Sequence, residues 1–306
     1  MAATPFGLFA GLATLDVVHH VHRPPGPDEK VTATATYVAA GGPAANAAVT
    51  FAALGGRAVL TTVLGSGAVA DLVRADLLRY GVEVLDLALP GTALTPPVSA
   101  ITVTAGTGER SVVGSDARGA PDVEPSAHLL ARLGAADVVL LDGHHPRLAV
   151  GIARAAHDAG VPVVVDLGRW KPVFDDLAPL TTHAVCSAGV RPPGATSAAD
   201  TAAHLRRRGV PVVVATAGAG PVRLWSVMPD GEPASGLDLA DMAVLVEVPT
   251  VPAVDTLGAG DAFHGAYAFA VAHGAGAVEA ARLGVEVAAE RVQHAGPRAW
   301  LAALRR

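Results

Sequence analysis

Residues 137–168, DVVLLDGHHPRLAVGIARAAHDAGVPVVVDLG, contain two short apolar runs separated by a segment of different periodicity. The runs 137–143 and 161–168 consist largely of Val and Leu without regular polar alternation, which is typical of strands buried on both faces. Between them, 146–160 carries apolar residues at helical spacing and ends in Gly160, a common helix stop. A strand, a helix and a second strand in this order predict two parallel strands joined by a crossover helix.

The same alternation extends along the rest of the chain. Helices are expected at 41–56, 199–209 and about 259–273, and strands at 57–65, 210–216 and 242–248. Alternating strands and helices of this kind favour an α/β fold with a mostly parallel central sheet.

Three segments in the first third of the chain have another character. Thr- and Val-rich, partly alternating stretches lie at 15–25, 29–40 and 96–114, separated by Pro and Gly. Partial alternation indicates strands with one face buried and one face exposed. We therefore expect a small half-exposed sheet, assembled from two separate insertions into the α/β core.

Composition restricts the classes of function. Of the 306 residues, 51% are hydrophobic and 16% are charged, so a large core is expected. The net charge is −6 and the 22 Lys and Arg residues form no long block, which argues against a nucleic-acid partner. The single Cys186 excludes an internal disulfide framework and a multi-cysteine metal site. No signal-peptide pattern or membrane-length apolar run is present, so we expect a cytoplasmic protein without a membrane partner.

The stretch 254–267, VDTLGAGDAFHGAY, places small residues directly before an acid at a helix start. Gly258, Ala259 and Gly260 lack bulky side chains, so their N–H groups can converge on one cavity, and the helix start adds partial positive charge. This arrangement suits an anion such as a phosphate. Asp261 could then accept the proton of a hydroxyl that attacks the bound phosphorus. The alternative is that Asp261 only caps the helix and the glycines form a tight turn.

Two sets of residues carry a resemblance to a known family. They are Asp255, Thr256, Gly258, Ala259, Gly260, Asp261, Gly265 and Ala266 near the C-terminus, and Gly41, Gly42, Pro43, Asn46, Ala48, Gly55 and Gly65 near the N-terminus. Their order and spacing resemble the two signatures of the PfkB/ribokinase-like carbohydrate kinases, and the resemblance spans nearly the whole chain. It implies a single kinase domain over 1–306 with a ribokinase-like three-layer α/β fold. In that fold, about 15–38 and 94–116 would form a β-sheet lid over the sugar.

Members of this family transfer the γ-phosphoryl group of ATP, bound with Mg²⁺, to a hydroxyl of a sugar or nucleoside. The resemblance implies that Asp261 is the catalytic base and that 258–260 form the anion hole. It implies a substrate site made by Asp16, Gly41, Gly42, Asn46 and Arg110, to which Lys30 is added as a candidate from its place in the expected lid. It also implies a nucleotide site made by Ser187, Thr216, Gly218, Gly220, Gly258 and Gly260. Asp255 would help bind a monovalent cation such as K⁺, or else is a buried acid that stabilises the turn.

Three further residues leave the substrate open. His144 follows the strand 137–143 at the carboxyl edge of the sheet, where α/β proteins bind ligands, and is a candidate for a sugar contact or a loop-stabilising residue. Lys30 and Arg110 lie in the expected lid. If both reach the site, the substrate carries a phosphate or sulfonate; otherwise they are solvated lid residues.

The sequence departs from the family pattern at the nucleotide side. Where many relatives carry Asn-x-x-Glu, this chain has CSAGV, and this loss resembles ketohexokinase-like and sulfofructose-kinase-like branches, which favours a ketose. The runs FHG after Asp261 and AGPRAW near the end resemble the sulfofructose-kinase-like branch. The nucleotide loop TAGAGP ends in Pro221, and Val285 stands where an Asn often lies near adenine, so the adenine contacts stay open.

The leading interpretation is an ATP-dependent kinase of a ketose or ketose derivative, such as sulfofructose or a fructose phosphate. A nucleoside or ribose kinase of the same family is the first alternative, disfavoured for nucleosides because Tyr37 is the only aromatic residue of the lid segments. A sugar-sensing pseudokinase that binds without turnover is the second. The exposed edge of a lid sheet also predicts a homodimer joined lid to lid.

Overall fold

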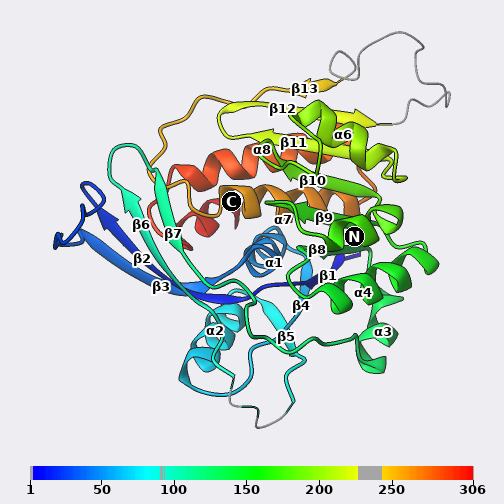
Figure 1. Ribbon diagram of the computed structural model, residues 1–306, viewed down its shortest axis with the longest axis horizontal. Helices are drawn as coiled ribbons and strands as arrows, with labels where there is room; N and C mark the ends of the chain where they lie inside the picture. The colour runs from blue at the N-terminus through cyan, green and yellow to red at the C-terminus, as the bar shows by residue number, and fades with distance from the viewer. Residues whose placement is uncertain (1–2, 90–91, 93, 227–242, 306) are drawn as a thin grey trace.

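The computed structural model describes residues 3–89, 92, 94–226 and 243–305. Within them, nine strands form the central sheet, in the order β13-β12-β11-β10-β9-β8-β1-β4-β5 (Figure 1). All pair in parallel except β12 and β13, which join antiparallel at one edge. The strands are β1 (Phe6–Ala10), β4 (Arg57–Thr62), β5 (Val82–Asp86), β8 (Val138–Leu141), β9 (Val163–Leu167), β10 (His183–Ser187), β11 (Val212–Ala217), β12 (Gly220–Ser226) and β13 (Val244–Val246).

Helices cover both faces of this sheet. One layer packs against the core that contains Phe9 and Leu60, and consists of α1 (Pro43–Ala53), α2 (Ala68–Arg79), α7 (Ala259–Ala272) and α8 (Ala277–Val292), with the 3₁₀ helix η3 (Ala299–Arg305). The other layer packs against the core that contains Leu8 and Val59, and consists of α3 (Ala127–Leu133), α4 (Pro146–Asp158), α5 (Val173–Leu177) and α6 (Ala198–Arg206), with η1 (Ala178–Leu180). The chain therefore folds as three layers, helix on sheet on helix.

The residue patterns explain these layers. Every residue of β8 is fully buried, as expected of a strand with helices on both sides. α4 buries Leu148, Ala149, Ile152 and Ala156, which recur along one helical stripe. α7 is instead apolar around most of its circumference, because α1, α8 and the sheet enclose it. This packing holds the first turn of α7, which contains Asp261, beside the sheet.

A second sheet of four strands projects from one side of the three layers (Figure 1). Its order is β3 (Ala35–Gly41), β2 (Thr14–Val21), β6 (Val98–Thr104) and β7 (Arg110–Val113), with β2 and β6 parallel and the other pairs antiparallel. Alternate residues of β2 and β6, among them Val18, His20, Ile101 and Val103, are buried toward the core, and the opposite face is largely exposed. We call this sheet the lid.

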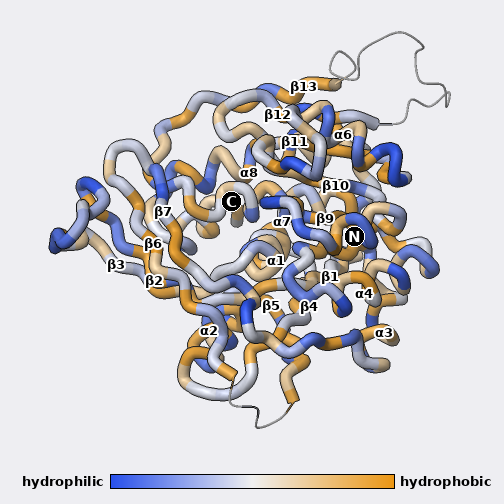
Figure 2. Tube along the Cα trace, viewed as in Figure 1, coloured by the Kyte–Doolittle hydropathy of each residue, from blue (hydrophilic) through white to orange (hydrophobic). Residues whose placement is uncertain are grey.

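The expected fold class, an α/β fold with a mostly parallel central sheet and a small separate sheet, is confirmed. The expectation of a strand over 29–40 is wrong in its first half, because β3 begins only at Ala35. The preceding chain contains Pro24, Pro25 and Pro27, which cannot donate to a strand partner, and it forms the hydrophilic tip of the lid (Figure 2). No helix in the described ranges has the length and apolar character needed to cross a membrane.

Candidate active site

The candidate anion hole lies where a loop turns into α7. Gly258 precedes the helix with φ +70°, in the left-handed region that glycine adopts without strain. A Cβ at Gly258 would contact Asp261 Oδ2 at 3.7 Å and Asn46 Nδ2 at 3.8 Å. The first N–H groups of a helix have no intrahelical partner. At Gly260 a Cβ would meet nothing within 4 Å, so there is room for an anion beside this residue, whereas the amide of Ala259 donates to the carbonyl of Thr256 at 3.4 Å.

Asp261 lies in the first turn of α7 and is half-buried. Removal from water raises the pKa of its carboxyl to about 6, and the charge of Asp166 acts in the same direction. Asn46 opposes this rise, since its Nδ2 donates to Asp261 Oδ2 at 2.8 Å. The charges of His264 and Arg110 also favour the carboxylate. Asp261 is therefore a carboxylate at neutral pH with an affinity for protons above that of an ordinary Asp.

Arg298, which we did not anticipate from the sequence, fixes the orientation of Asn46. Its Nη1 donates to Asn46 Oδ1 at 3.1 Å, and its Nη2 pairs with Asp76 at 3.0 Å and donates to the carbonyl of Ala40 at 2.6 Å. A guanidinium can only donate, so the amide oxygen of Asn46 must face Arg298 and its NH₂ group must face Asp261. The run AGPRAW, which contains Arg298, shows no periodicity that predicts this contact.

On the acceptor side, the lid and α1 bring Asp16 and two glycines together. Asp16 is buried in β2 and accepts a hydrogen bond from Thr14 Oγ1 at 2.6 Å. Burial raises the pKa of its carboxyl above the ordinary value, against hydrogen bonds from Thr14 and Ser99. A Cβ at Gly41 would lie 2.0 Å from Asp16 Oδ2, so only glycine permits this approach, and Gly42 at φ +96° starts α1.

One small cavity connects these residues. Asp16, Asn46, Gly258 and Arg298 all line a cavity of about 20 Å³ between the lid, α1 and the loop before α7. This is room for roughly one water molecule. Asp16, Asn46 and Gly258, three of the predicted site residues, therefore surround one cavity. Asp261 adjoins them through its hydrogen bond with the side chain of Asn46.

The two basic residues of the lid have different surroundings. Arg110 begins β7 opposite Val103 and is exposed, and its Nη1 donates to Thr256 Oγ1 at 3.2 Å. Thr256 in turn holds the lid, donating from Oγ1 to the carbonyl of Gly108 at 2.7 Å. Arg110, Glu109 and Thr256 line a cleft of about 390 Å³. Lys30 is exposed on the segment between β2 and β3, and in the described part of the chain it has no hydrogen bond or ion pair that would hold it near the site.

The predicted nucleotide residues lie at the carboxyl ends of two neighbouring strands. Ser187 ends β10 and stands in register with Thr216 of β11. Gly218, at φ +62°, lies in the tight turn between β11 and β12, and Gly220 begins β12. Val285 is buried in the hydrophobic core on the α8 side, so its side chain offers no polar contact to a base.

Asp166 and His264 adjoin these residues and were also missed. His264 Nε2 lies 3.3 Å from the carbonyl of Val185 in β10, and its Nδ1 lies 2.6 Å from the carbonyl of Gly260 and 3.5 Å from Asp166 Oδ2. This places the start of α7 at the edge of the sheet where β9 and β10 end. Burial raises the pKa of Asp166. An acid next to the end of an otherwise apolar strand, as in VVVDL, is the signal that could have identified it.

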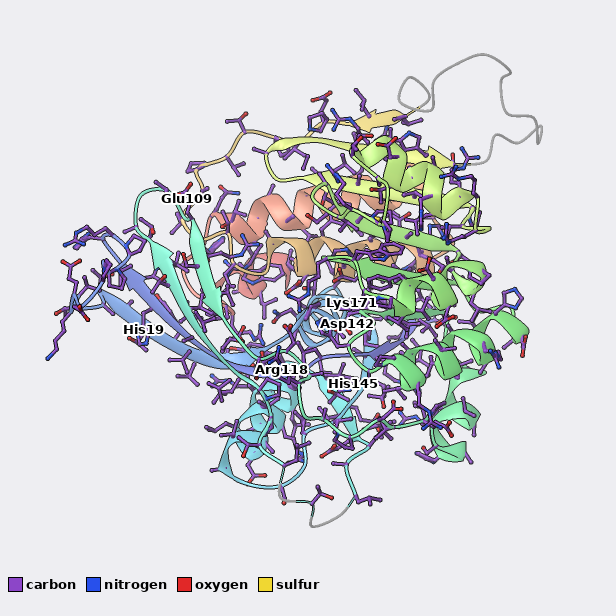
Figure 3. All side chains as sticks on the ribbon, viewed as in Figure 1. His19, Glu109, Arg118, Asp142, His145 and Lys171 are labelled. Atoms are coloured by element: carbon purple, nitrogen blue, oxygen red, sulfur yellow. The ribbon has the colours of Figure 1, made fainter. Side chains whose placement is uncertain are left out.

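His144 lies beside Asp142, with its Nδ1 3.0 Å from Asp142 Oδ1; Figure 3 labels Asp142. Asp142 accepts from the amides of Leu12 at 2.8 Å and Ala44 at 3.2 Å, so it ties β1, α1 and β8 together. Burial alone would raise the pKa of Asp142, but His144, Lys171 and the amide of Leu12 hold it well below its ordinary value. His144 and Lys171 line a cleft of about 1070 Å³ bordered by α4 and α5, distinct from the cavity at Asp16.

The residues around Asp255 do not fit the monovalent cation that the resemblance implies. Asp255 is fully buried, and protein donors surround its carboxylate. Oδ1 accepts from the amide of Leu257 at 2.9 Å, and Oδ2 from the amide of Gly296 at 2.9 Å and from His20 Nε2 at 3.2 Å. The guanidinium of Arg291 also lies 3.4 Å from Oδ2. A cation would have to displace these donors and approach a like charge.

Comparison with known proteins matches nearly the whole chain. Residues 8–303 match the model of a family described as pfkB family carbohydrate kinase. A putative ribokinase from Agrobacterium tumefaciens is similar in structure, with 26% identity, a TM-score of 0.81, and coverage of 99% of this chain and 98% of that chain. A ribokinase from Arabidopsis thaliana, complexed with ribose and ATP, has 22% identity, a TM-score of 0.74 and full coverage of both chains. An adenosine kinase from Sinorhizobium meliloti has 20% identity, a TM-score of 0.75 and 99% coverage of each chain.

Proposed function

The chain belongs to the pfkB family of carbohydrate kinases, and on that premise we propose that it transfers the γ-phosphoryl group of ATP to a hydroxyl of a ketose or ketose derivative. The observation that carries the proposal is Asp261, a half-buried carboxylate whose pKa is raised to about 6 and which follows Gly260, a residue beside open space in the first turn of α7. A base of this strength is matched to a proton transfer near neutral pH.

In the proposed reaction, the acceptor lies between Asp16 in the lid and Asp261. Its hydroxyl proton passes to a carboxylate oxygen of Asp261 as the hydroxyl oxygen forms a bond to the γ-phosphorus. The bond between the γ-phosphorus and the oxygen of the β-phosphate breaks, and ADP leaves. The amides around Gly258 and Gly260 hold the charge that develops on the transferring group. The lid excludes water, which would otherwise compete as the acceptor.

Mg²⁺ would enter this site with the nucleotide. It binds through one or two carboxylates together with the phosphates of its substrate. Asp166 is the carboxylate near the start of α7 that the proposed proton transfer does not use, and it would help to hold the ion; among the described residues no group of three or more His, Cys, Asp or Glu side chains forms a closed metal cage. When bound, Mg²⁺ supplies neutralisation of the phosphate charge.

Arg110 supports an anionic acceptor, as in the sulfofructose-kinase-like branch. Its guanidinium borders the 390 Å³ cleft beside the loop that leads to Asp261, and guanidinium groups bind phosphate and sulfonate oxygens well. Lys30, exposed at the lid tip, contributes to such a site only if the lid tip folds inward. The anionic acceptor thus rests on Arg110.

A ribose or nucleoside acceptor is the alternative that the likeness to ribokinases and an adenosine kinase favours. For a nucleoside, the lid would have to provide an aromatic partner for the base. Tyr37 already packs edge-on against His20, at 5.2 Å between ring centroids, and against Gly296. A neutral ribose meets no such objection. A sugar-sensing pseudokinase remains the reading if the altered nucleotide loop prevents ATP use.

The outer face of the lid supports a homodimer. Val38, Val17, Ala100 and Val113 stand opposite one another in register and form an apolar row across all four lid strands. Val38 is 55% exposed and Val113 75% exposed. A continuous apolar row in water favours a partner surface, and a second lid offers the matching row.

ADP release with Mg²⁺-ATP, measured across a panel of acceptors, tests the proposed function. The panel contains fructose, fructose 1-phosphate, fructose 6-phosphate, sulfofructose, tagatose 6-phosphate, ribose and adenosine. Turnover confined to the anionic ketoses is expected. Turnover with ribose or adenosine alone would favour the alternative acceptor. The absence of sugar-dependent ADP release, while the protein still binds one of the sugars in calorimetry, would favour the pseudokinase.

A further inference from the structure

Arg291 is a buried cation that the proposed reaction does not use. It lies in the last turn of α8, and only 1% of its surface is exposed. Its Nη1 donates to the carbonyls of His294 at 2.9 Å and Asp255 at 3.3 Å, and its Nη2 lies 3.4 Å from Asp255 Oδ2. Two backbone carbonyls and a carboxylate are the oxygen ligands that a dehydrated monovalent metal ion would require. A guanidinium fills this set of oxygens instead.

The Asp255–Arg291 pair joins the loop before the anion hole to the end of α8. The carbonyl of Val292 accepts from the amides of Val254 at 2.7 Å and Asp255 at 3.1 Å. Asp255 Oδ1 accepts from the amide of Leu257, the residue directly before Gly258. The position of the candidate anion hole therefore depends on the buried carboxylate, and the carboxylate depends on a positive charge close to it.

From this geometry we infer that Arg291 is a built-in cation that takes the place of a bound monovalent metal ion and keeps the loop 254–258 in position. The inference rests on the proposed function for its consequence in catalysis, but its structural part does not. A K⁺ ion near Asp255 would be repelled by the guanidinium, and the carbonyls that would replace its hydration shell are already engaged. The protein is therefore independent of monovalent metal ions, and Arg291 is a positioning residue.

The first test uses the unaltered protein. Its melting temperature and its rate of ADP release are compared in KCl, NaCl and choline chloride at equal ionic strength. An ion that binds the native state raises the melting temperature as its concentration rises. We expect the three melting temperatures to coincide and the rates to agree. A melting temperature that rises with KCl but not with choline chloride, or a rate that K⁺ stimulates, would overturn the inference.

The second test creates the site that Arg291 fills. Arg291→Ala leaves Asp255 without its cation. We expect the loop 254–258 to move by about 1 Å as a result, and kcat/KM to fall on the order of 100-fold. Added K⁺ or millimolar guanidinium should restore part of the melting temperature and activity, whereas choline should not. The matched control is Arg282→Ala, which removes an exposed arginine from the same helix.

The outcomes separate the two proposals. If no sugar gives ADP release, the melting-temperature comparisons still decide the role of Arg291. An Arg291→Ala protein that responds to K⁺ and guanidinium no more than Arg282→Ala does would contradict the inference. If Arg291→Ala does not fold in choline chloride, recovery of folded protein with K⁺ or guanidinium supports the inference, and the absence of recovery with either cation contradicts it.

Discussion

Replacing Asn46 by Leu tests the link between the buried amide and the proposed base. The change removes the hydrogen bond from Asn46 Nδ2 to Asp261 Oδ2, which is 2.8 Å long. A hydrogen bond to a charged group contributes about 1.5–3 kcal/mol, and 1.36 kcal/mol corresponds to one pKa unit. Loss of this donor disfavours the carboxylate, so the pKa of Asp261 should rise by roughly one to two units from its value of about 6. Because the base must be ionised, activity at neutral pH should fall and recover at higher pH.

The assay is the pH dependence of kcat/KM for the acceptor, followed by ADP release with saturating Mg²⁺-ATP between about pH 5 and 9. The acid limb of the profile should move to higher pH in Asn46→Leu. Thr50→Val is the control, because Thr50 is buried in the same helix and donates to the carbonyl of Asn46 without touching Asp261. A fall in the plateau alone would mean that Asn46 binds the acceptor. An acid limb at the same pH as in the unaltered protein would mean either that the limb does not report the ionisation of Asp261 or that the hydrogen bond from Asn46 does not lower the pKa of Asp261.

The remaining predictions concern the acceptor site and the lid. Gly41→Ala places a methyl group 2.0 Å from the Asp16 carboxylate, so the KM for the acceptor should rise at least about tenfold. The control Gly276→Ala, whose methyl group enters open space, should leave this KM unchanged. Equal KM values in the two variants would contradict the acceptor site. Arg110→Met should raise the KM for anionic acceptors but not the KM for neutral sugars, as measured in the acceptor panel; an equal rise in both KM values would remove the anionic-acceptor argument. Val38→Asp together with Val113→Asp should convert the proposed dimer to a monomer in light scattering, and a dimer that survives both changes would place the interface elsewhere.

The fold could be predicted because its signals are local. The apolar runs that became β8 and β9 and the helical segment that became α4 each show their period within a few residues. The start of β3 could not be located from the sequence, because it depends on pairing with β2 across the lid. In that pairing Thr36 lies opposite His19, which Figure 3 labels. The Pro-rich chain before Ala35 contains the β-favouring Val31 and Thr32, but the pairing of β3 with β2 starts only at Ala35, opposite His20.

The candidate site likewise has one part that the sequence predicts and another part that only the folded chain reveals. Gly258, Gly260 and Asp261 are neighbours in one stretch, so the sequence alone relates an anion hole to a base. Arg298 meets Asn46 across 252 positions, and Arg291 meets Asp255 across 36. Around neither arginine does the sequence show a periodic pattern that would distinguish a buried arginine from an exposed one. Their roles follow only from burial and from the donors and acceptors that the folded chain brings to them.

The most direct test of the whole account is the turnover of Asp261→Asn. The substitution keeps the shape of the side chain and removes its ability to take a proton. Once the acceptor panel has identified a substrate, kcat should fall about 10²- to 10⁴-fold, while calorimetry shows acceptor and ATP binding close to that of the unaltered protein. Loss of turnover with binding retained is the result expected of a base. An Asp261→Asn protein that releases ADP at the unaltered rate would show that Asp261 only caps α7 and that the proton goes elsewhere.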